Sequence, residues 1–445
     1  MAAPNFRNRT LYHGDNLPVL RGMNSGSVDL IATDPPFNKG KDFHATPDSL
    51  AAGAKFQDRW SWDDDVEGEW VDQITDDWPH VMNVINGSKQ SYGEDMGAFL
   101  CFMAVRLLEM RRVLKDTGSL YLHCDPTASH YLKELLDAIF GRRHFRNEIV
   151  WHYSGWNKRM ARHLERRHDV ILFYAKGTTQ VFHTPTRPWK SRDEYVAKRK
   201  QKVRTDEAGR EYVLSDGGGG TRVRRYLEDA MAYGVPFDDV WPIPKLNNSD
   251  KERQGYPTQK PLALYERIIQ ASSNKGDLVL DPFAGCATTP IAAERLGREW
   301  VGIDLWDGAL GIVRRRMEDN RQLLADIPTI HYETAPPART DGGDEAVPFL
   351  QVTERYAEPE GPRMSRAAMY DHLLAQHGQR CQGCDRTFDD PRYLELDHNT
   401  PRSDGGLNHI TNRVLLCGPC NRAKSNTYTL SGLRRLNRRN GWMAN

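Results

Sequence analysis

A short apolar run that ends at two prolines constrains the fold more than any other part of this chain. Residues 28–38 read VDLIATDPPFN, and the first six have the apolar and β-branched content of a buried strand. Pro35 and Pro36 fix φ and lack an N–H group, so the strand must give way to a stiff, extended turn. That turn holds a carboxylate (Asp34), a free backbone carbonyl (Pro35) and an aromatic ring (Phe37) at fixed mutual positions.

These three groups suit one kind of ligand. Two acceptors beside a flat ring fit a planar heterocycle with an exocyclic amine, because the acceptors take its N–H bonds and the ring stacks on its face. Such bonds draw the lone pair of the amine out of conjugation and make the nitrogen nucleophilic. The alternative is a proline-rich turn with an incidental acid, and four residues alone do not separate the two interpretations.

A second informative stretch covers residues 256–305. It predicts a turn, a helix at 262–271, a strand that ends at Asp281, a loop FAGCATT that opens another helix, and a strand that ends at Asp304. Gly285 in the loop permits close backbone approach, and the following helix offers N–H groups and its positive dipole end. An acid that closes the next strand suits two ribose hydroxyls. One glycine where dinucleotide loops have three speaks against NAD, and an ordinary βαβ turn is the alternative.

Strands and helices also alternate between these two stretches. The pattern predicts helices at 96–114 and 130–141 and strands at 119–125 and 169–176, and such alternation indicates a parallel α/β sheet. His123, followed by a cysteine, ends one of these strands, where open α/β sheets place their sites. Because cysteine is so often buried, packing is the favoured interpretation of this pair over catalysis.

Two insertions interrupt the alternation. Residues 40–95 are acidic and rich in tryptophan, so they are not expected to lie on phosphates; a lid and a dimer-forming insertion are the open alternatives. Residues 177–250 carry dense lysine and arginine between 185 and 225, around the glycine run 217–220. A solvated helix face explains any one basic cluster, but their confinement to one insertion favours a phosphate-tracking arm with a mobile tip.

Several motifs and their order resemble the beta group of DNA amino-methyltransferases. The resemblance covers roughly residues 10–320 and is strongest over LYLHCDPTASHYL, FRNEIVW and YPTQKPL, with the DPPF stretch before the cofactor loop. It implies a Rossmann-like α/β sheet, S-adenosylmethionine as methyl donor, double-stranded DNA as substrate and a target-recognition region in the basic insertion. An Asp rather than a Ser before the two prolines favours adenine N6 over cytosine N4.

The resemblance also implies roles for single residues. The flipped base is held by the residues of the DPPF turn, Asp34, Pro35, Pro36 and Phe37. S-adenosylmethionine is held by residues from four separate stretches, namely Asp15, Gln259, Lys260, Pro261, Asp281, Phe283, Gly285 and Asp304. For Asp15 a helix N-cap is an equally good interpretation.

Length and composition set the outer limits. A chain of 445 residues is too long for one ordinary domain, and a net charge of +1 means that any nucleic-acid surface must arise from segregated charge. Without a membrane-length apolar run or a signal peptide, we expect a cytoplasmic protein, prokaryotic or phage-encoded, with a homodimer as an open alternative. The predicted organisation is a methyltransferase domain at 1–330, a linker rich in proline, glycine and acids at 331–365, and a compact module at 366–445.

Two CxxC pairs organise the C-terminal module. Their members are Cys381, Cys384, Cys417 and Cys420. In a chain expected to be cytosolic, cysteines are thiols or metal ligands, and this spacing predicts a tetrahedral zinc site. A module this small needs such a staple to fold. Four thiolates leave no open position on the metal, so the zinc is structural.

The residues between and after the CxxC pairs resemble the HNH nucleases, a ββα-metal fold, in their H-N-N form. The resemblance implies that Asp397 and Asn421 carry Mg²⁺ or a similar divalent ion, and that His398 activates water. Asn412 steadies the loop and the imidazole, and Lys424 and the arginine-rich tail bind phosphates. The alternatives are a zinc-stapled DNA-binding module without activity and a degenerate nuclease; competent side chains at all four polar positions favour activity.

Three functions therefore remain open. The favoured one is an adenine-N6 DNA methyltransferase with an attached nuclease, which modifies and restricts DNA with one chain. The second is an orphan methyltransferase whose zinc module only binds DNA or a partner, and cytosine N4 is an alternative target for either. The third is an RNA or protein-amide methyltransferase, which the basic insertion and the HNH motif disfavour.

Overall fold

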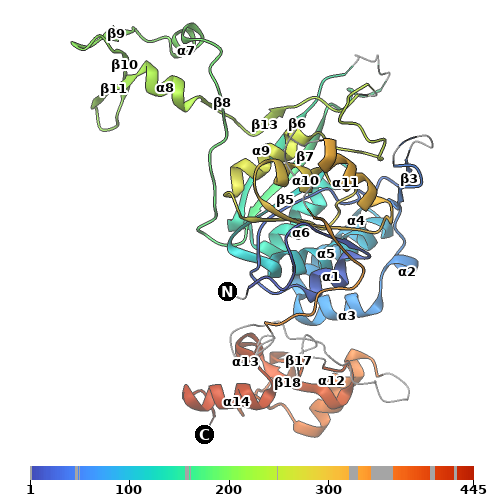
Figure 1. The fold of residues 1–445 in the computed structure, drawn as a ribbon. Helices are drawn as coiled ribbons and strands as arrows, with labels where there is room; N and C mark the ends of the chain where they lie inside the picture. Colours follow the sequence, from blue (N-terminus) through green and yellow to red (C-terminus); the bar gives the residue numbers. More distant parts are fainter. Residues whose placement is uncertain are drawn as a thin grey trace.

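A computed structural model describes residues 3–45, 49, 51–155, 160, 162–247, 249–319, 329–341, 364–400, 406–424 and 428–444. Among these residues nine strands form one sheet (Figure 1). In spatial order they are β13 (Val240–Pro242), β6 (Phe145–His152), β7 (His168–Ala175), β5 (Leu114–Cys124), β2 (Val28–Thr33), β14 (Leu278–Asp281), β15 (Glu299–Asp304), β1 (Thr10–His13) and β16 (His331–Glu333). The apolar run before the two prolines is thus a central strand.

The sheet is mixed rather than parallel throughout. Neighbouring strands run parallel except at β7, which is antiparallel to both β5 and β6. The predicted parallel α/β sheet is therefore confirmed except at β7. The strands β6 and β7 follow one another in the chain and pair directly, as the strands of a hairpin do, whereas parallel neighbours need a crossover connection.

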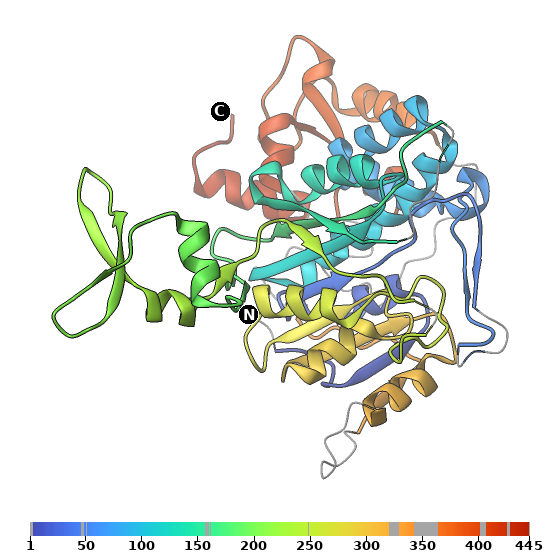
Figure 2. The ribbon, with the colours of Figure 1, turned by 90° about the horizontal axis from the view of Figure 1, so that it is seen from above.

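Helices cover both faces of the sheet, so the large domain has three layers (Figure 2). One face carries α1 (Asn16–Gly22), α3 (Gly68–Asp77), α4 (Pro79–Ser91), α5 (Glu94–Val113) and α6 (Ser129–Phe140). The other face carries α9 (Leu262–Ser272), α10 (Thr288–Arg295) and α11 (Ala309–Asp319). Each helical layer packs on one face of the sheet and forms an apolar core with it. These two cores hold in place the strand ends that carry the predicted site residues.

The acidic, tryptophan-rich insertion divides into two parts. Its first part is a hairpin of β3 (Phe43–His44) and β4 (Lys55–Phe56), followed by α2 (Trp62–Asp65). Its second part supplies α3 and α4, and Trp70 of α3 is buried in the core that α5 completes. The insertion therefore extends the helical layer as well as reaching over the strand ends.

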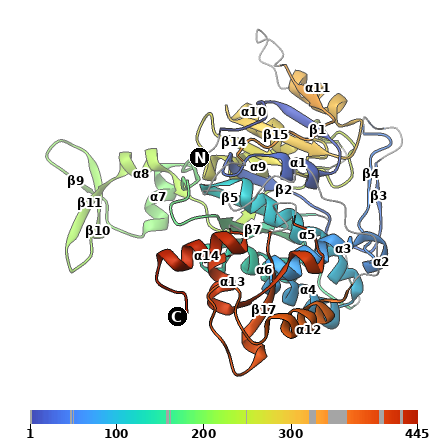
Figure 3. The ribbon, with the colours of Figure 1, turned by 90° about the horizontal axis from the view of Figure 1, so that it is seen from below.

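The basic insertion forms an arm that projects from the body of the protein (Figures 1 and 3). Its elements are β8 (Thr186–Arg187), α7 (Arg192–Arg199), β9 (Arg204–Thr205), β10 (Glu211–Asp216), β11 (Arg222–Tyr226), α8 (Leu227–Tyr233) and β12 (Val235–Pro236). Tyr195, Val213 and Leu227 are buried together, so the arm has a small core of its own. Several arginines pair with glutamates inside the arm, whereas β11 exposes Arg222 and its neighbours to solvent.

The C-terminal module has a separate core. It consists of α12 (Arg366–His377), a hairpin of β17 (Leu394–His398) and β18 (Arg413–Cys417), α13 (Gly418–Lys424) and α14 (Leu430–Arg439). Residues 331–341, which the sequence analysis assigns to the linker, pack on the large domain. The backbone N–H of Thr340 donates to Asn24 Oδ1 over 2.8 Å, and Asp341 Oδ2 accepts from the Ser25 N–H over 2.7 Å. In the described ranges, no helix combines the length and the apolar character that a membrane span needs.

Candidate functional site

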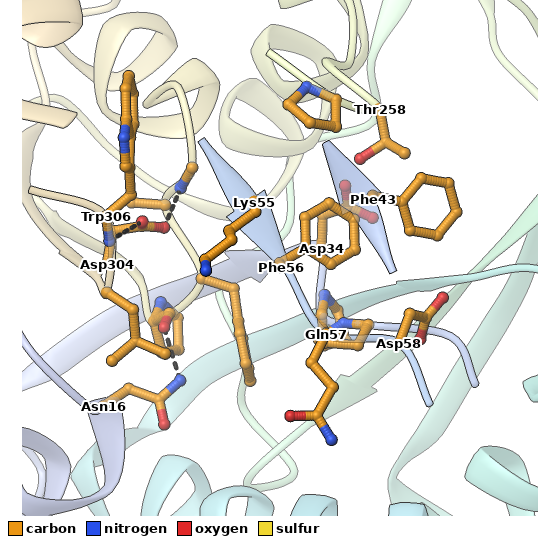
Figure 4. A pocket seen from close by; sticks show the side chains of 18 of the residues that line it. Asn16, Asp34, Phe43, Lys55, Phe56, Gln57, Asp58, Thr258, Asp304 and Trp306 are labelled. Atoms are coloured by element: carbon orange, nitrogen blue, oxygen red, sulfur yellow. Dashed lines mark hydrogen bonds between the residues drawn. The ribbon is translucent and has the colours of Figure 1, made fainter. Parts of the chain in front are cut away.

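One large cavity opens at the carboxyl ends of β1, β2, β14 and β15, the edge at which open α/β sheets bind ligands. Its volume is about 1360 Å³. Pockets for one small molecule measure roughly 300–1000 Å³, so this cavity has room for more than one ligand. Figure 4 shows Asp304 and Trp306 at one end and Asp34 toward the other, with Lys55 and Phe56 of β4 drawn between them.

The DPPF turn is held from the acidic insertion. Asp58 is buried, and its Oδ1 accepts the backbone N–H groups of Phe37 (2.8 Å) and Asn38 (2.6 Å). Burial raises the pKa of Asp58 to about 6, although these backbone hydrogen bonds favour the charged form. The Phe37 side chain is buried and lines the cavity. The position of this ring therefore depends on a carboxylate 21 residues further along the chain.

The Asp34 carboxylate lies between two basic side chains. Its Oδ1 is 2.9 Å from His123 Nδ1, and its Oδ2 accepts a hydrogen bond from the Lys260 ammonium. Burial works against the charge of Asp34, but Lys260 and His123 together outweigh it and lower the pKa of this carboxyl. Asp34 is therefore an ionised acceptor in a largely water-excluded position.

The other end of the cavity is built by the glycine loop and the end of β15. Asp304 accepts the N–H of Gly285 at Oδ2 (2.6 Å) and the N–H of Trp306 at Oδ1 (2.8 Å), as Figure 4 shows. Burial raises the pKa of Asp304. Gly285 has φ +53°, and a Cβ at this position would lie 2.9 Å from the ring of Tyr256. Both the backbone conformation and the close ring require glycine here.

Two further predicted cofactor residues are acids with structural partners. Asp281 is buried at the end of β14, accepts a hydrogen bond from Thr33 Oγ1 (2.7 Å), and has a pKa raised by burial to about 7. Asp15 caps α1 by accepting the N–H of Leu17 (2.7 Å) and also binds Arg106 with both carboxylate oxygens. The N-cap interpretation of Asp15 holds, and the same residue lines the cavity.

In the QKP turn before α9, the side chains of Gln259 and Lys260 bind other residues of the protein. The side-chain amide of Gln259 accepts the N–H of Gln254 (2.7 Å) and donates to the carbonyl of Glu252 (2.8 Å), so it fixes its own loop. Lys260 turns toward Asp34, and Pro261 caps the helix. Gln259 and Lys260 line the cavity together with Phe283 of the glycine loop.

Two residues next to this site were not selected from the sequence as site residues. His123 was interpreted as packing, yet both of its ring nitrogens face carboxylates. Its position at the end of a predicted strand was the one feature of the sequence that could have identified His123 as a site residue. Asp58 lies within a run of acids, and nothing in that run distinguishes it from its neighbours.

The four cysteines of the C-terminal module come together as predicted from their spacing. Cys381, Cys384, Cys417 and Cys420 are buried, and their sulfur atoms all lie within 4.8 Å of one another. Tetrahedral zinc–sulfur bonds of about 2.3 Å place sulfur atoms about 3.8 Å apart. The separation of 3.8 Å between the sulfurs of Cys384 and Cys417 fits that geometry, as does the all-thiol donor set.

The predicted nuclease residues lie on β17, the loop that follows it, and α13. Asp397 pairs with Lys424 Nζ (2.8 Å), and the Asn421 amide donates to Glu395. His398 is buried, with Nδ1 3.4 Å from the Arg413 guanidinium. These contacts mean that a divalent ion at Asp397 would compete with an ammonium.

Asn412 acts on the loop between the two strands of the module. Its Oδ1 accepts the N–H of Thr400 (2.8 Å), and its Nδ2 donates to the carbonyls of Thr400 (2.9 Å) and Leu407 (3.1 Å). These bonds hold the chain directly after His398 in one conformation.

Comparison with known proteins agrees with the two-part architecture. Residues 28–314 match a family described as DNA methylase, and residues 381–427 match the HNH endonuclease family. The type II methyltransferase M.HpaI of Haemophilus parainfluenzae is 26% identical over 303 residues, which are 68% of this chain and 72% of that protein. The DNA adenine methyltransferase YhdJ of Escherichia coli strain K12 is 26% identical over 310 residues, 70% of this chain and 83% of that protein.

Solved structures include the PvuII DNA methyltransferase, described as cytosine-N4-specific. It is 16% identical, has a TM-score of 0.40, and the match covers 72% of this chain and 90% of that one.

Proposed function

Since the chain belongs to the DNA methylase family and carries a C-terminal HNH endonuclease domain, we propose that it transfers the methyl group of S-adenosylmethionine to adenine N6 in double-stranded DNA. The observation that carries this proposal is that the Asp34–Phe37 turn and the Asp304–Gly285 end line one cavity. Adenine is favoured by Asp34 and by the relative YhdJ, described as a DNA adenine methyltransferase. Cytosine N4 is the alternative.

The chain contributes mostly positioning to this reaction. Asp34 and the carbonyl of Pro35 accept the N–H bonds of the flipped amine, and Phe37 stacks on the base. Bound S-adenosylmethionine supplies a methyl group on a sulfonium, an activated leaving group. The nitrogen lone pair forms the new N–C bond, the C–S bond breaks with its electrons on sulfur, and one proton leaves the amine. Holding the two reactants in line then accounts for most of the rate enhancement.

We assign the cofactor to the end of the cavity that Asp304 and Gly285 build. The residues present fit such a group: an acid for ribose hydroxyls, a loop that only glycine permits, and the aromatic faces of Phe283 and Trp306. Asp15 and Asp281 line the same end, whereas Gln259 and Pro261 support it by fixing the turn before α9.

For the C-terminal module we propose a structural zinc ion and a nuclease activity that cuts or nicks DNA with Mg²⁺ or a similar ion. Asp397 and Asn421 would hold that ion, and His398 would activate the water. The match to the HNH endonuclease family supports this assignment. The alternative is a module that only binds DNA. We further propose that the methyltransferase domain extends beyond the predicted limit of 330 to residue 341, because β16 and the residues after it pack on the sheet domain, and that the module spans 366–445. We also propose a cytoplasmic protein that acts on DNA, either alone or as a homodimer.

One experiment tests both activities. Plasmid DNA is incubated with the full chain, Mg²⁺ and methyl-labelled S-adenosylmethionine, and label and strand breaks are both scored. Asp34→Ala should remove the label, whereas Asp63→Ala, an exposed acid of α2 outside the cavity lining, should not. Nucleoside analysis of the product distinguishes N6-methyladenine from N4-methylcytosine. Label on RNA or protein but not on DNA would contradict the proposal.

The nuclease half is read from the same reactions. Strand breaks that require Mg²⁺ and vanish in His398→Ala, with the methyl label retained, support an active module. Methylation without cleavage, in the original chain and in His398→Ala alike, would leave the module a binding unit.

A further inference from the structure

His123 lies at the end of β5, buried, with a carboxylate at each ring nitrogen. Its Nδ1 is 2.9 Å from Asp34 Oδ1, and its Nε2 is 3.4 Å from Asp169 Oδ2. Asp169 reaches this position because β7 runs antiparallel to β5, which places the start of one strand beside the end of the other. Both ring nitrogens therefore lie within ion-pair distance of a carboxylate, and His123 contacts the two acids at once.

Asp169 is itself anchored on its far side. Its Oδ1 accepts the hydroxyl of Tyr153 (3.1 Å), and the ammonium of Lys245 lies 3.9 Å from its Oδ2 and 3.5 Å from the centroid of the Tyr153 ring. Burial opposes the charge of Asp169, but the neighbouring His123 holds the pKa of this acid well below its usual range. Lys245, Asp169, His123 and Asp34 therefore form a continuous row of contacts between basic and acidic side chains.

The same imidazole contacts the aromatic part of the turn. The ring of His123 meets the ring of Phe37 edge-on, with centroids 5.3 Å apart, and also meets the ring of Trp151 edge-on, with centroids 5.5 Å apart. His123 thus touches two of the three groups that the proposed function places against the flipped base, Asp34 and Phe37.

We infer that His123, held by Asp169, is a positioning residue for methyl transfer: it fixes the Asp34 carboxylate and the Phe37 ring in the orientation that receives the target amine. The inference rests on the proposed function. Each oxygen of Asp34 has a second lone pair, so the oxygens held by His123 and Lys260 can still accept the N–H bonds of a substrate. An acceptor fixed before the substrate arrives needs no reorganisation during the reaction.

This arrangement also assigns the proton that leaves the amine. Despite burial, Lys260 and His123 hold the pKa of Asp34 low, so Asp34 orients the amine and does not keep the proton. The proton released as the N–C bond forms and the C–S bond breaks is therefore passed on from this carboxylate.

The test is single-turnover methylation by the full chain with saturating S-adenosylmethionine and DNA, which isolates the methyl-transfer step. His123→Ala should lower the rate constant on the order of 100-fold, the effect of a misplaced reacting group, while the Kd values for cofactor and DNA change less than about threefold. His123→Gln retains one donor and should recover part of the rate. Asp169→Asn should reduce the rate in the original chain and add little in the His123→Ala background.

Cys124→Ala is the matched control. Cys124 is the next residue of β5, equally buried but in the apolar core, so its truncation perturbs packing without touching Asp34. It should retain the rate constant within about twofold. If His123→Ala does not fold, His123→Gln and Asp169→Asn decide the question by the same measurement.

The outcomes separate the two claims. If the original chain does not label DNA, the proposed function fails. If the original chain labels DNA and folded His123→Ala does so at the same rate, only the positioning role fails. Loss confined to Kd, or full additivity with Asp169→Asn, also overturns it, because a purely structural residue would give those results.

Discussion

The methyltransferase domain and the C-terminal module are stabilised by different means. In the large domain, Asp34 keeps its charge between His123 and Lys260, and the surrounding sheet and helices supply an extensive apolar core. In the module, four of the twelve buried residues of the core are the clustered cysteines. A core of twelve buried residues is too small to stabilise a fold by packing alone. The comparison of the two cores therefore indicates that the size of the apolar core decides whether a domain needs a structural metal.

The largest expected effect tests the metal side of this comparison. Cys417→Ala should release the zinc and unfold the module, because structural zinc contributes an apparent 10–16 kcal/mol, roughly, in small domains. Metal content and resistance of residues 364–444 to proteolysis measure the loss. Methyl labelling of DNA should persist.

Cys101→Ala is the control, since Cys101 is a buried cysteine in the core of the large domain. It should leave the metal content unchanged. A module that stays folded and metal-free in Cys417→Ala would remove the distinction between the two cores.

The second prediction concerns a buried acid of the large domain that is held by backbone N–H groups. Because burial raises the pKa of Asp58 to about 6, the folded protein keeps a proton that the unfolded chain releases near pH 4. Its contribution to the free energy of unfolding should therefore fall by about 3 kcal/mol as the pH rises from 4 to 7. The difference in unfolding free energy between the original chain and Asp58→Asn measures this change.

Asp63→Asn, an exposed acid in the same insertion, should show no such trend. A difference for Asp58→Asn that grows with rising pH would mean that the backbone bonds outweigh burial.

A third, smaller effect is expected at the cofactor end of the cavity. Gly285→Ala places a Cβ at φ +53° and 2.9 Å from the Tyr256 ring, so the loop must move. We expect the KM for S-adenosylmethionine to rise about tenfold, because the moved loop should lose about 1–2 kcal/mol of binding free energy for this ligand. Gly276→Ala has the same backbone penalty at φ +83° with no atom within 4 Å, and should leave KM unchanged.

The smallest effect returns to the module and its surface. Arg435 and Arg438 are exposed on α14, and the double change to alanine should weaken DNA binding by the module a few-fold. The slope of log K against log salt should fall by about 2, one for each phosphate contact. Arg434→Ala is the matched control, because Arg434 is bound to Asp385 over 2.7 Å and should affect stability more than the salt slope.

Local sequence predicted what depends on local chemistry. The central strand before Pro35, the loop around Gly285 and the cysteine cluster each follow from a short stretch whose residues leave few conformations. The boundaries of α5 and α6 were predicted to within about two residues, because apolar periodicity is strong in both.

The sequence did not reveal contacts between distant segments. His123 meets Asp169 only because β7 reverses direction, and strand direction is not written in any local pattern. Asp58 meets the DPPF turn because a long insertion folds back over the cavity. The Gln259 amide binds its own loop, which depends on backbone groups several residues away.

The arm that carries the basic residues begins and ends at one point. Its first strand, β8, pairs with its last strand, β12, with Arg187 opposite Val235. The elements between them form a small apolar core of their own from Tyr195, Val213 and Leu227. Because both ends of the arm lie at this strand pair, the whole arm can be replaced by joining another one at β8 and β12. If the arm recognises the target sequence, as the resemblance implies, a new arm joined at these two strands should change the DNA sequence that is methylated and leave the residues at the sheet unchanged.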